Sequence, residues 1–258
     1  MNYRILLPML GACALTFQAC NSGKMETYYD NDQVKERWTE VSNAQGVKVK
    51  QGLFEAFDEK GNKRDSVVYE QGKREGTEIK WAADGKKTFV SNWTNGQANG
   101  RFEEYAVNGK LIKVTTLKLG IPDGPEFSYN KQGVMIEEKH FKNGIQDSVY
   151  HRWNDKGEMK QQAFYMDGKL HGVQLDWCEE DKYRAVLRDS VNIVMGKRQG
   201  VEVYHLCLNG ELSSILTWKD DHMDGAYTHW DEGKKIVEIY QDGKCIRNCP
   251  KAPVPPPQ

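Results

Sequence analysis

The sequence predicts an all-β protein, an elongated antiparallel β-meander of tandem β-hairpin repeats about 24 residues long. Three observations lead to this fold class. Glycines recur at a fixed spacing, aromatic residues recur at the same spacing, and the segments between them alternate polar with apolar residues. Alternation with a period of two is typical of strands. Glycines at such short intervals would break any helix in this region.

The period is visible in five independent series of residues. The first two are glycine series, Gly72, Gly96, Gly120, Gly144, Gly168 and Gly52, Gly76, Gly100, Gly124, Gly172, with Ser148 in the second. A third glycine series is Gly61, Gly85, Gly109, Gly133 and Gly157. Two more series hold mainly aromatic residues, Phe57, Trp81, Tyr105, Tyr129, Trp153, Trp177 and Tyr69, Trp93, Leu117, Phe141, Tyr165. Each series therefore marks one position of the repeat.

Each repeat is expected to form one hairpin. A strand follows the second glycine and ends near the first aromatic residue. A short turn such as Asp84-Gly85 or Asn108-Gly109 comes next, because glycine supplies the positive φ that tight turns need. A second strand of about eight residues follows. Six-residue loops such as QGKREG and DGKLHG then lead into the next unit.

About eight such units are expected over residues 41–244. Residues 20–40 are expected to form a tether and a degenerate N-terminal cap, since terminal repeats are often atypical. The sixth unit carries about four extra residues around 179–192. Residues 245–258 form a cysteine-containing end and a proline-rich tail. Because long open sheets are rare, we expect the meander to coil strongly or to close.

Composition excludes two classes of protein. The 258 residues contain 36 Lys and Arg against 37 Asp and Glu, so no cationic excess is available for nucleic acid. Seven Trp, 12 Tyr and 8 Phe are too many aromatic residues for a disordered chain. Stability is expected to come from packing between neighbouring units, which accommodates a small apolar fraction.

Residues 1–19 are expected to be a signal peptide. One positive charge at Arg4 precedes a mostly apolar run that is too short to span a bilayer. Ala19 then precedes Cys20, which looks like a bacterial lipoprotein signal with Cys20 as the lipidated residue. Cys13 is the alternative processing site, and an ordinary cleaved signal is the alternative class. We expect an exported protein, lipid-anchored in the bacterial cell envelope at the outer membrane.

The repeat resembles the variant MORN repeat of bacterial proteins. The resemblance lies in G-K-x-x-G, followed by an aromatic residue and a G-K turn, as in residues 72–76 and 168–172. It covers about 200 residues; departures are Ser148, Ile121-Pro122 and the insertion in the sixth unit. The resemblance implies an elongated repeat sheet with a non-enzymatic binding or scaffold role. Some relatives carry an antitoxin-like label, and others are linked to membranes.

No catalytic, metal or cofactor site is expected. The six histidines lack any zinc-ligand spacing with cysteines, and H-E-x-x-H is absent. The sequence also lacks G-x-S-x-G and the phosphate-binding G-x-x-x-x-G-K-[ST]. His222 and His229, which share one unit, are better explained as strand residues than as metal ligands.

Four further cysteines allow three disulfide connectivities. Cys245 and Cys249 are the candidate pair, since a bond between them would close a small loop at the end of the last unit. Cys178 and Cys207 occupy equivalent strands of adjacent units, which a regular meander holds ~10 Å apart. A disulfide between them requires the insertion to distort the sheet, because Cα separations in disulfides end near ~7 Å.

One position alternates between aromatic and polar residues. It lies two residues after the second glycine, on the face opposite the first aromatic series. The aromatic members are Phe54, Phe102, Tyr150 and Tyr227; the others are Glu78, Glu126, Gln174 and Glu202. Cross-strand packing is one interpretation. A spaced row of contact aromatics for a ligand is the other.

These observations favour a lipid-anchored binding or scaffold module for a protein partner. A glycan- or lipid-contacting module at the membrane surface is the alternative. An enzyme is the interpretation with least support.

Overall fold

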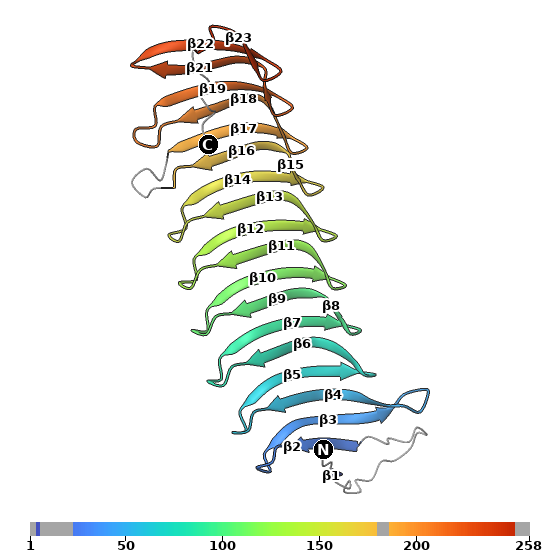
Figure 1. The fold of residues 1–258 in the computed structure, drawn as a ribbon. Coiled ribbons are helices and arrows are strands. Elements are labelled where there is room, and N and C mark those ends of the chain that lie inside the picture. The colour runs from blue at the N-terminus through green and yellow to red at the C-terminus, as the bar shows by residue number, and fades with distance from the viewer. Residues whose placement is uncertain (1–3, 6–22, 180–185, 251–258) are drawn as a thin grey trace. The chain divides into compact units, whose positions relative to one another are not determined.

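The computed structural model describes residues 4–5, 23–179 and 186–250. These described residues form 23 strands, β1 to β23, and no helix. The predicted all-β class and the antiparallel meander of consecutive hairpins are both confirmed (Figure 1). The number of strands exceeds two per repeat for two reasons. Some lie at the two ends of the chain, and β8, β15 and β20 are two-residue pieces of interrupted strands.

The chain divides into two compact units, Met1–Gly133 and Val134–Gln258. The strands of the first unit are β1 (Arg4–Ile5), β2 (Gly23–Tyr28), β3 (Val34–Ser42), β4 (Lys48–Phe57), β5 (Lys63–Glu70), β6 (Lys73–Trp81), β7 (Lys87–Thr94), β8 (Gln97–Ala98), β9 (Gly100–Tyr105), β10 (Leu111–Lys118) and β11 (Ile121–Tyr129). The strands of the second unit are β12 (Met135–Lys142), β13 (Ile145–Trp153), β14 (Met159–Met166), β15 (Lys169–Leu170), β16 (Gly172–Trp177), β17 (Leu187–Val194), β18 (Lys197–His205), β19 (Leu212–Lys219), β20 (His222–Met223), β21 (Gly225–Asp231), β22 (Lys234–Gln241) and β23 (Lys244–Arg247).

Within each unit, successive described strands pair antiparallel in chain order. Neither unit closes on itself, so of the two expected alternatives, strong coiling or closure, closure does not occur. Most of the pairings contain a register shift, as between Ser66 and Val68. Such bulges bend individual strands, and the strands in Figure 1 are visibly bent. Bending crowds the side chains of one face together, so burying them does not require closure.

The hairpins have two-residue turns on one side of the sheet, which we call the short-turn side. In the turn between β5 and β6, Gln71 and Gly72 both have positive φ, 49° and 81°. Lys73 already belongs to β6, and the next glycine, Gly76, lies inside that strand. The predicted six-residue loops are therefore wrong. A glycine within a strand marks a bulge, and sequence spacing alone does not distinguish it from the end of a loop.

On the other side, which we call the long-turn side, most turns have several residues. In the turn after β6, Ala82 donates from its backbone N–H to the carbonyl of Lys86, and Gly85 donates to that of Ala82. Asp58, Asn130 and Asn154 accept backbone N–H groups two residues on in equivalent turns. These are the Asx contacts that stabilise turns. The predicted Asx-Gly turns lie at this side.

In each compact unit the two faces of the sheet differ in burial. One face, here the buried face, carries Phe54, Val67, Glu78 and Ser91 in the first unit and Glu202, Leu216 and Trp218 in the second, all at most 8% exposed. In the first unit its core is Trp38, Phe54 and Val67, with Met25 and Tyr69 packed against them. The opposite face, here the exposed face, carries Leu53, Val68, Phe164, Val173 and Val201, which are 37–55% exposed. Neighbours in sequence, such as Leu53 and Phe54, thus lie in opposite environments.

Candidate functional site

The four predicted contact aromatics all lie on the buried face. Each ring meets a ring of the second aromatic series edge-on: Phe54 with Tyr69, Phe102 with Trp93, Tyr150 with Tyr165, and Tyr227 with Tyr240, at centroid separations of 5.9–6.4 Å. These separations fit the usual geometry of aromatic pairs. The four residues lie opposite the first aromatic series, as expected, but on the same face as the second. They are part of cross-strand aromatic pairs.

Phe54 shows how far this differs from a row of contact side chains. The ring is 8% exposed and belongs to the core of the first unit. Its strand partner Val67 is 2% exposed. Phe102, Tyr150 and Tyr227 are half-buried. Phe54 therefore offers almost no surface to a ligand, because the side chains of its own sheet cover it.

Carboxylates occupy the same face at the positions between these aromatics. Glu78 is 1% exposed and Glu202 is 2% exposed. The indole nitrogen of Trp93 donates to Glu78 at 2.9 Å, and that of Trp218 donates to Glu202 at 2.5 Å. Such bonds to a charged acceptor offset the cost of burying it.

An arginine completes each of these two clusters. Arg74 lies over the Trp93 ring, with 4.6 Å from its guanidinium carbon to the ring centroid. Arg198 lies over Trp218 at 3.5 Å. Both arginines also lie 3.8 Å from the glutamate four residues on. We call each set of Arg, Glu and Trp a stacked cluster. The same arrangement thus occurs in both compact units.

The second unit also holds two carboxylates opposite each other. Asp176 on β16 is the direct strand partner of Asp189 on β17, and both are 7% exposed. Like charges in such a pair repel. Burial, with the nearby Glu202 and Asp176 carboxylates, raises the pKa of Asp189 from 3.8 to about 7. One oxygen of Asp189 is buried without a hydrogen-bond partner. This pair is thus an electrostatically unfavourable feature of the buried face.

The exposed face carries apolar side chains that sequence analysis did not single out. Val173 and Val201 each follow the second glycine of a unit and are 55% and 54% exposed. Phe164, 37% exposed, is the strand partner of Val149 at the same repeat position. Leu53 and Val68 form the corresponding pair in the first unit. The apolar residue after the second glycine was visible in the sequence, but its exposure depends on which face the bending buries.

Three of the six histidines form hydrogen bonds with carboxylates. His140 and His151 both contact Glu138 at 2.9 Å, and His229 contacts Glu238 at 3.2 Å. Among the residues the structure describes, no group of His, Cys, Asp and Glu has the arrangement of a metal site.

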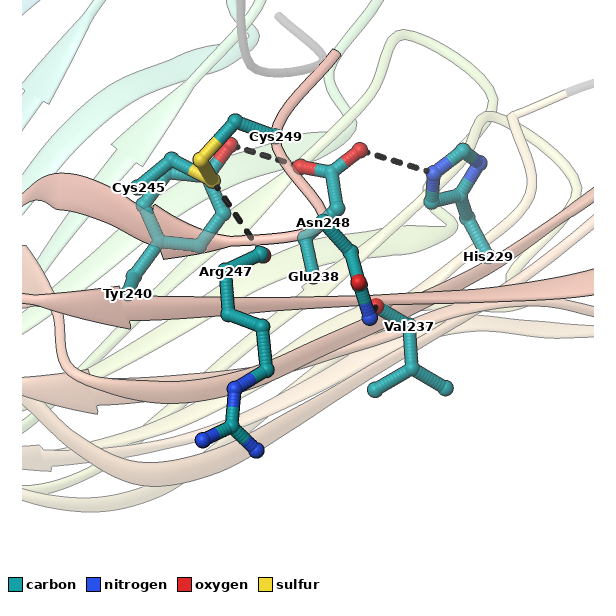
Figure 2. The surroundings of a disulfide bond; sticks show 8 residues. All are labelled: His229, Val237, Glu238, Tyr240, Cys245, Arg247, Asn248 and Cys249. Atoms are coloured by element: carbon teal, nitrogen blue, oxygen red, sulfur yellow. Dashed lines mark hydrogen bonds and ion pairs between the residues drawn. A yellow bond between two sulfur atoms is a disulfide. The ribbon is translucent and has the colours of Figure 1, made fainter.

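Both disulfides form within the second unit. Cys245, at the edge strand β23, joins Cys249 with a Cα separation of 5.6 Å (Figure 2). Cys178 joins Cys207, also at 5.6 Å. This pair is therefore closer than the ~10 Å that a regular meander would hold between equivalent strands. Cys178 and Cys207 lie just beyond the ends of β16 and β18, on the long-turn side.

Three predicted features lie outside the described residues: Cys20, most of the preceding signal segment and the proline-rich segment 251–258. In the part of the chain that is described, no helix is long and apolar enough to cross a membrane.

Comparison with known proteins found two solved structures that match this chain weakly: TcdB2-TccC3 without its hypervariable C-terminal region and TcdB2-TccC3-Cdc42. Both are 10% identical, with TM-scores of 0.18 and 0.15; the matches cover 89% and 84% of this chain. They cover only 15% and 16% of those chains. No curated protein matches.

A family model described as a MORN repeat variant matches residues 122–143. This segment lies in the repeat that contains Ile121-Pro122, rather than in the copies that follow G-K-x-x-G most closely. The chain is therefore an all-β repeat protein that carries a MORN repeat variant.

Proposed function

We propose that the chain is a lipoprotein of the bacterial cell envelope, processed and lipidated at Cys20, that binds a protein partner through its exposed face. In this proposal it acts as a scaffold and catalyses no reaction. Its lipid holds it at the outer membrane. The order of charge, apolar run, small residue and cysteine in residues 1–20 supports this address. The match to a variant MORN repeat is consistent with a binding or scaffold role.

The observation that carries the proposal is the exposed apolar residues of the second unit. Val173 and Val201 occupy the same repeat position on β16 and β18, and each is more than half exposed. Phe164 on β14 adds an exposed ring on the same face. Apolar side chains gathered on a free surface are typical of protein-binding sites. Thr77 and Arg101 occupy this repeat position in the first unit, so apolar character is not required for the fold.

The experiment compares two double variants of the full chain in native membranes. Val173→Ser with Val201→Ser removes the apolar residues, whereas Thr77→Ser with Arg101→Ser changes the same position where it is polar. Both should fold, because exposed substitutions usually change stability by less than about 0.5 kcal/mol. After detergent extraction, a partner should co-purify stoichiometrically with the wild type and the control variant, and be lost from the valine variant.

Two results would contradict the proposal. Equal partner recovery from both double variants would exclude the exposed face as the binding surface. Recovery of no partner, combined with binding of the delipidated protein to vesicles that depends on Val173 and Val201, would favour the lipid-contacting alternative. Mass spectrometry of the extracted protein tests lipidation at Cys20 independently.

A further inference from the structure

The first long strand, β2, has an edge that depends on processing. On one side β2 pairs with β3, where Met25 is opposite Trp38. On the other side it pairs with β1, where Arg4 is opposite Glu26 and Ile5 is opposite Met25. Both residues of β1 belong to the segment that processing at Cys20 would remove. The processed chain would then present an open strand edge, with unpaired backbone N–H and C=O groups.

The strand at the other end, β23, is protected instead. It has only four residues, and the Cys245–Cys249 disulfide turns the chain immediately after it. The Asn248 amide donates to the backbone carbonyl of Val237 at 3.0 Å, as Figure 2 shows. Pro250, which has no N–H to donate, follows. Short length, a covalent turn and proline are devices that discourage edge pairing, and they distinguish β23 from β2.

We propose that β2 of the processed chain pairs antiparallel with β2 of a second copy, centred on Met25, to form a two-fold symmetric dimer. This inference rests on the proposed processing at Cys20. In this register Met25 lies opposite Met25 of the second copy. Lys24 lies opposite Glu26, and the same pair recurs on the other side of the two-fold axis. A strand that complements itself in this way satisfies the symmetry of an isologous interface.

The backbone pairing between β1 and β2 shows that this edge accepts an antiparallel strand at Glu26 and Met25. In the proposed dimer, Lys24 of the second copy lies opposite Glu26, and its Met25 lies opposite Met25. Opposite charges in directly paired positions favour antiparallel association, and like charges disfavour it. The second copy therefore replaces the segment that processing removes.

Packing behind the edge supports the same centre. Met25 packs against Trp38, Phe54 and Val67, which form the core of the first unit. Pairing at Met25 would join the two cores across the interface. Glu26 is held in place by Arg37, 2.7 Å from its carboxylate, and by the Tyr28 hydroxyl at 2.6 Å. The Glu26 carboxylate is therefore already oriented in the monomer.

Cysteine cross-linking of the processed, detergent-extracted full-length product tests the register. In Met25→Cys, the new cysteines lie opposite each other, at a Cα separation of about 4.5–5.5 Å that a disulfide can span. In the control Thr27→Cys, they are displaced by four residues along antiparallel strands, about 13 Å, which is too far. Mild oxidation should give a covalent dimer with Met25→Cys and none with Thr27→Cys.

Charge reversal gives a second measurement. Lys24→Glu places like charges opposite each other twice and should raise the dimer dissociation constant about tenfold or more in light-scattering or sedimentation experiments. Adding Glu26→Gln removes the two like-charge pairs without placing a cation against Arg37, and should lower the dissociation constant again.

The outcomes separate this inference from the proposed function. A processed protein that remains monomeric, or cross-links equally at both cysteines, overturns the dimer and leaves the envelope proposal standing. A processed chain whose β2 edge is taken by a strand of another protein also overturns it. Retention of residues 1–19, seen by mass spectrometry, overturns both the processing and the pairing that depends on it.

Discussion

The guanidinium of Arg198 lies over the Trp218 ring, 3.5 Å from the ring centroid, and the indole nitrogen beneath it donates to the buried Glu202 carboxylate. Stacking on an indole leaves the guanidinium edges available for ion pairing. The arrangement thus satisfies a carboxylate inside a sheet that has little apolar core. We expect each stacked cluster to contribute strongly to the stability of the compact unit that contains it.

Trp218→Phe should destabilise the second unit by about 2 kcal/mol, because one oxygen of Glu202 loses its hydrogen-bond donor while staying buried. Urea unfolding followed by fluorescence would measure this. Trp93→Phe is the matched control in the first unit. There the Ser91 hydroxyl also donates to the same oxygen of Glu78, at 3.1 Å, so a smaller loss is expected. Equal losses would contradict this account of the two carboxylates.

Ser148→Gly should stabilise the protein by about 1 kcal/mol. Ser148 occupies the second-glycine position with φ of 72°, a backbone conformation that strains any residue with a Cβ. Gly76 has the same φ at the equivalent position, and a Cβ added there meets no atom within 4 Å. Gly76→Ala should therefore lose a similar amount through strain alone. Thermal unfolding of both variants tests the sign of each effect.

Stability should fall as the pH rises from about 4 to about 7, and Asp189 should be one cause. The pKa of Asp189 is raised by burial and by the Glu202 and Asp176 carboxylates to about 7, above its usual 3.8. The folded state therefore binds this proton more tightly than the unfolded state. The stabilisation that the protonated carboxyl contributes decreases as the pH rises and is lost once the pH passes 7.

Asp189→Asn should flatten this part of the pH profile and stabilise the protein most above pH 7. Two nearby cations, Arg188 and Arg198, oppose the rise in the pKa of Asp189. Urea midpoints at several pH values would provide the measurement. An unchanged slope in the variant would show that Asp189 does not control it.

The two disulfides should differ in their contribution to stability. Cys178–Cys207 links residues 29 apart, whereas Cys245–Cys249 links residues only 4 apart. In the chain-entropy account, removing the first should cost about 3.5 kcal/mol and removing the second about 2 kcal/mol. Paired Cys→Ser variants under oxidising conditions test the order. A larger loss at Cys245–Cys249 would mean that protecting the edge strand matters more than loop length.

Much of this architecture follows from spacing alone. Glycine and aromatic series located the hairpins, and Asx-Gly pairs such as Asn108-Gly109 located the long-turn side. The short-turn side was missed because Gly76, inside a strand, has the same sequence signature as a loop glycine. A glycine at this sequence spacing indicates a residue with positive φ, but the spacing does not distinguish a turn from a bulge.

The difference between the faces could not be predicted, for a physical reason. Leu53 and Phe54 are adjacent apolar residues of one strand. The alternation of side chains places them on opposite faces but does not say which face is buried. Which face is buried depends on the direction in which the strands bend, a property of many bulges together. The aromatic row around Phe54 was therefore identified correctly as a pattern, but its packing against Tyr69 required coordinates. The approach of Cys178 to Cys207 likewise depends on turns outside the regular strands.

The two kinds of turn also determine where the chain tolerates changes in length. Two-residue turns such as Gln71–Gly72 and Met195–Gly196 recur along the short-turn side. The longer turn at Leu206–Glu211 lies on the long-turn side. The turn between β21 and β22, which is shortened to Glu232–Gly233, also lies on the long-turn side. A peptide epitope or a small reporter domain should therefore be accommodated at Asn209–Gly210, whereas the same insertion at Gln71–Gly72 should disrupt strand register on both sides.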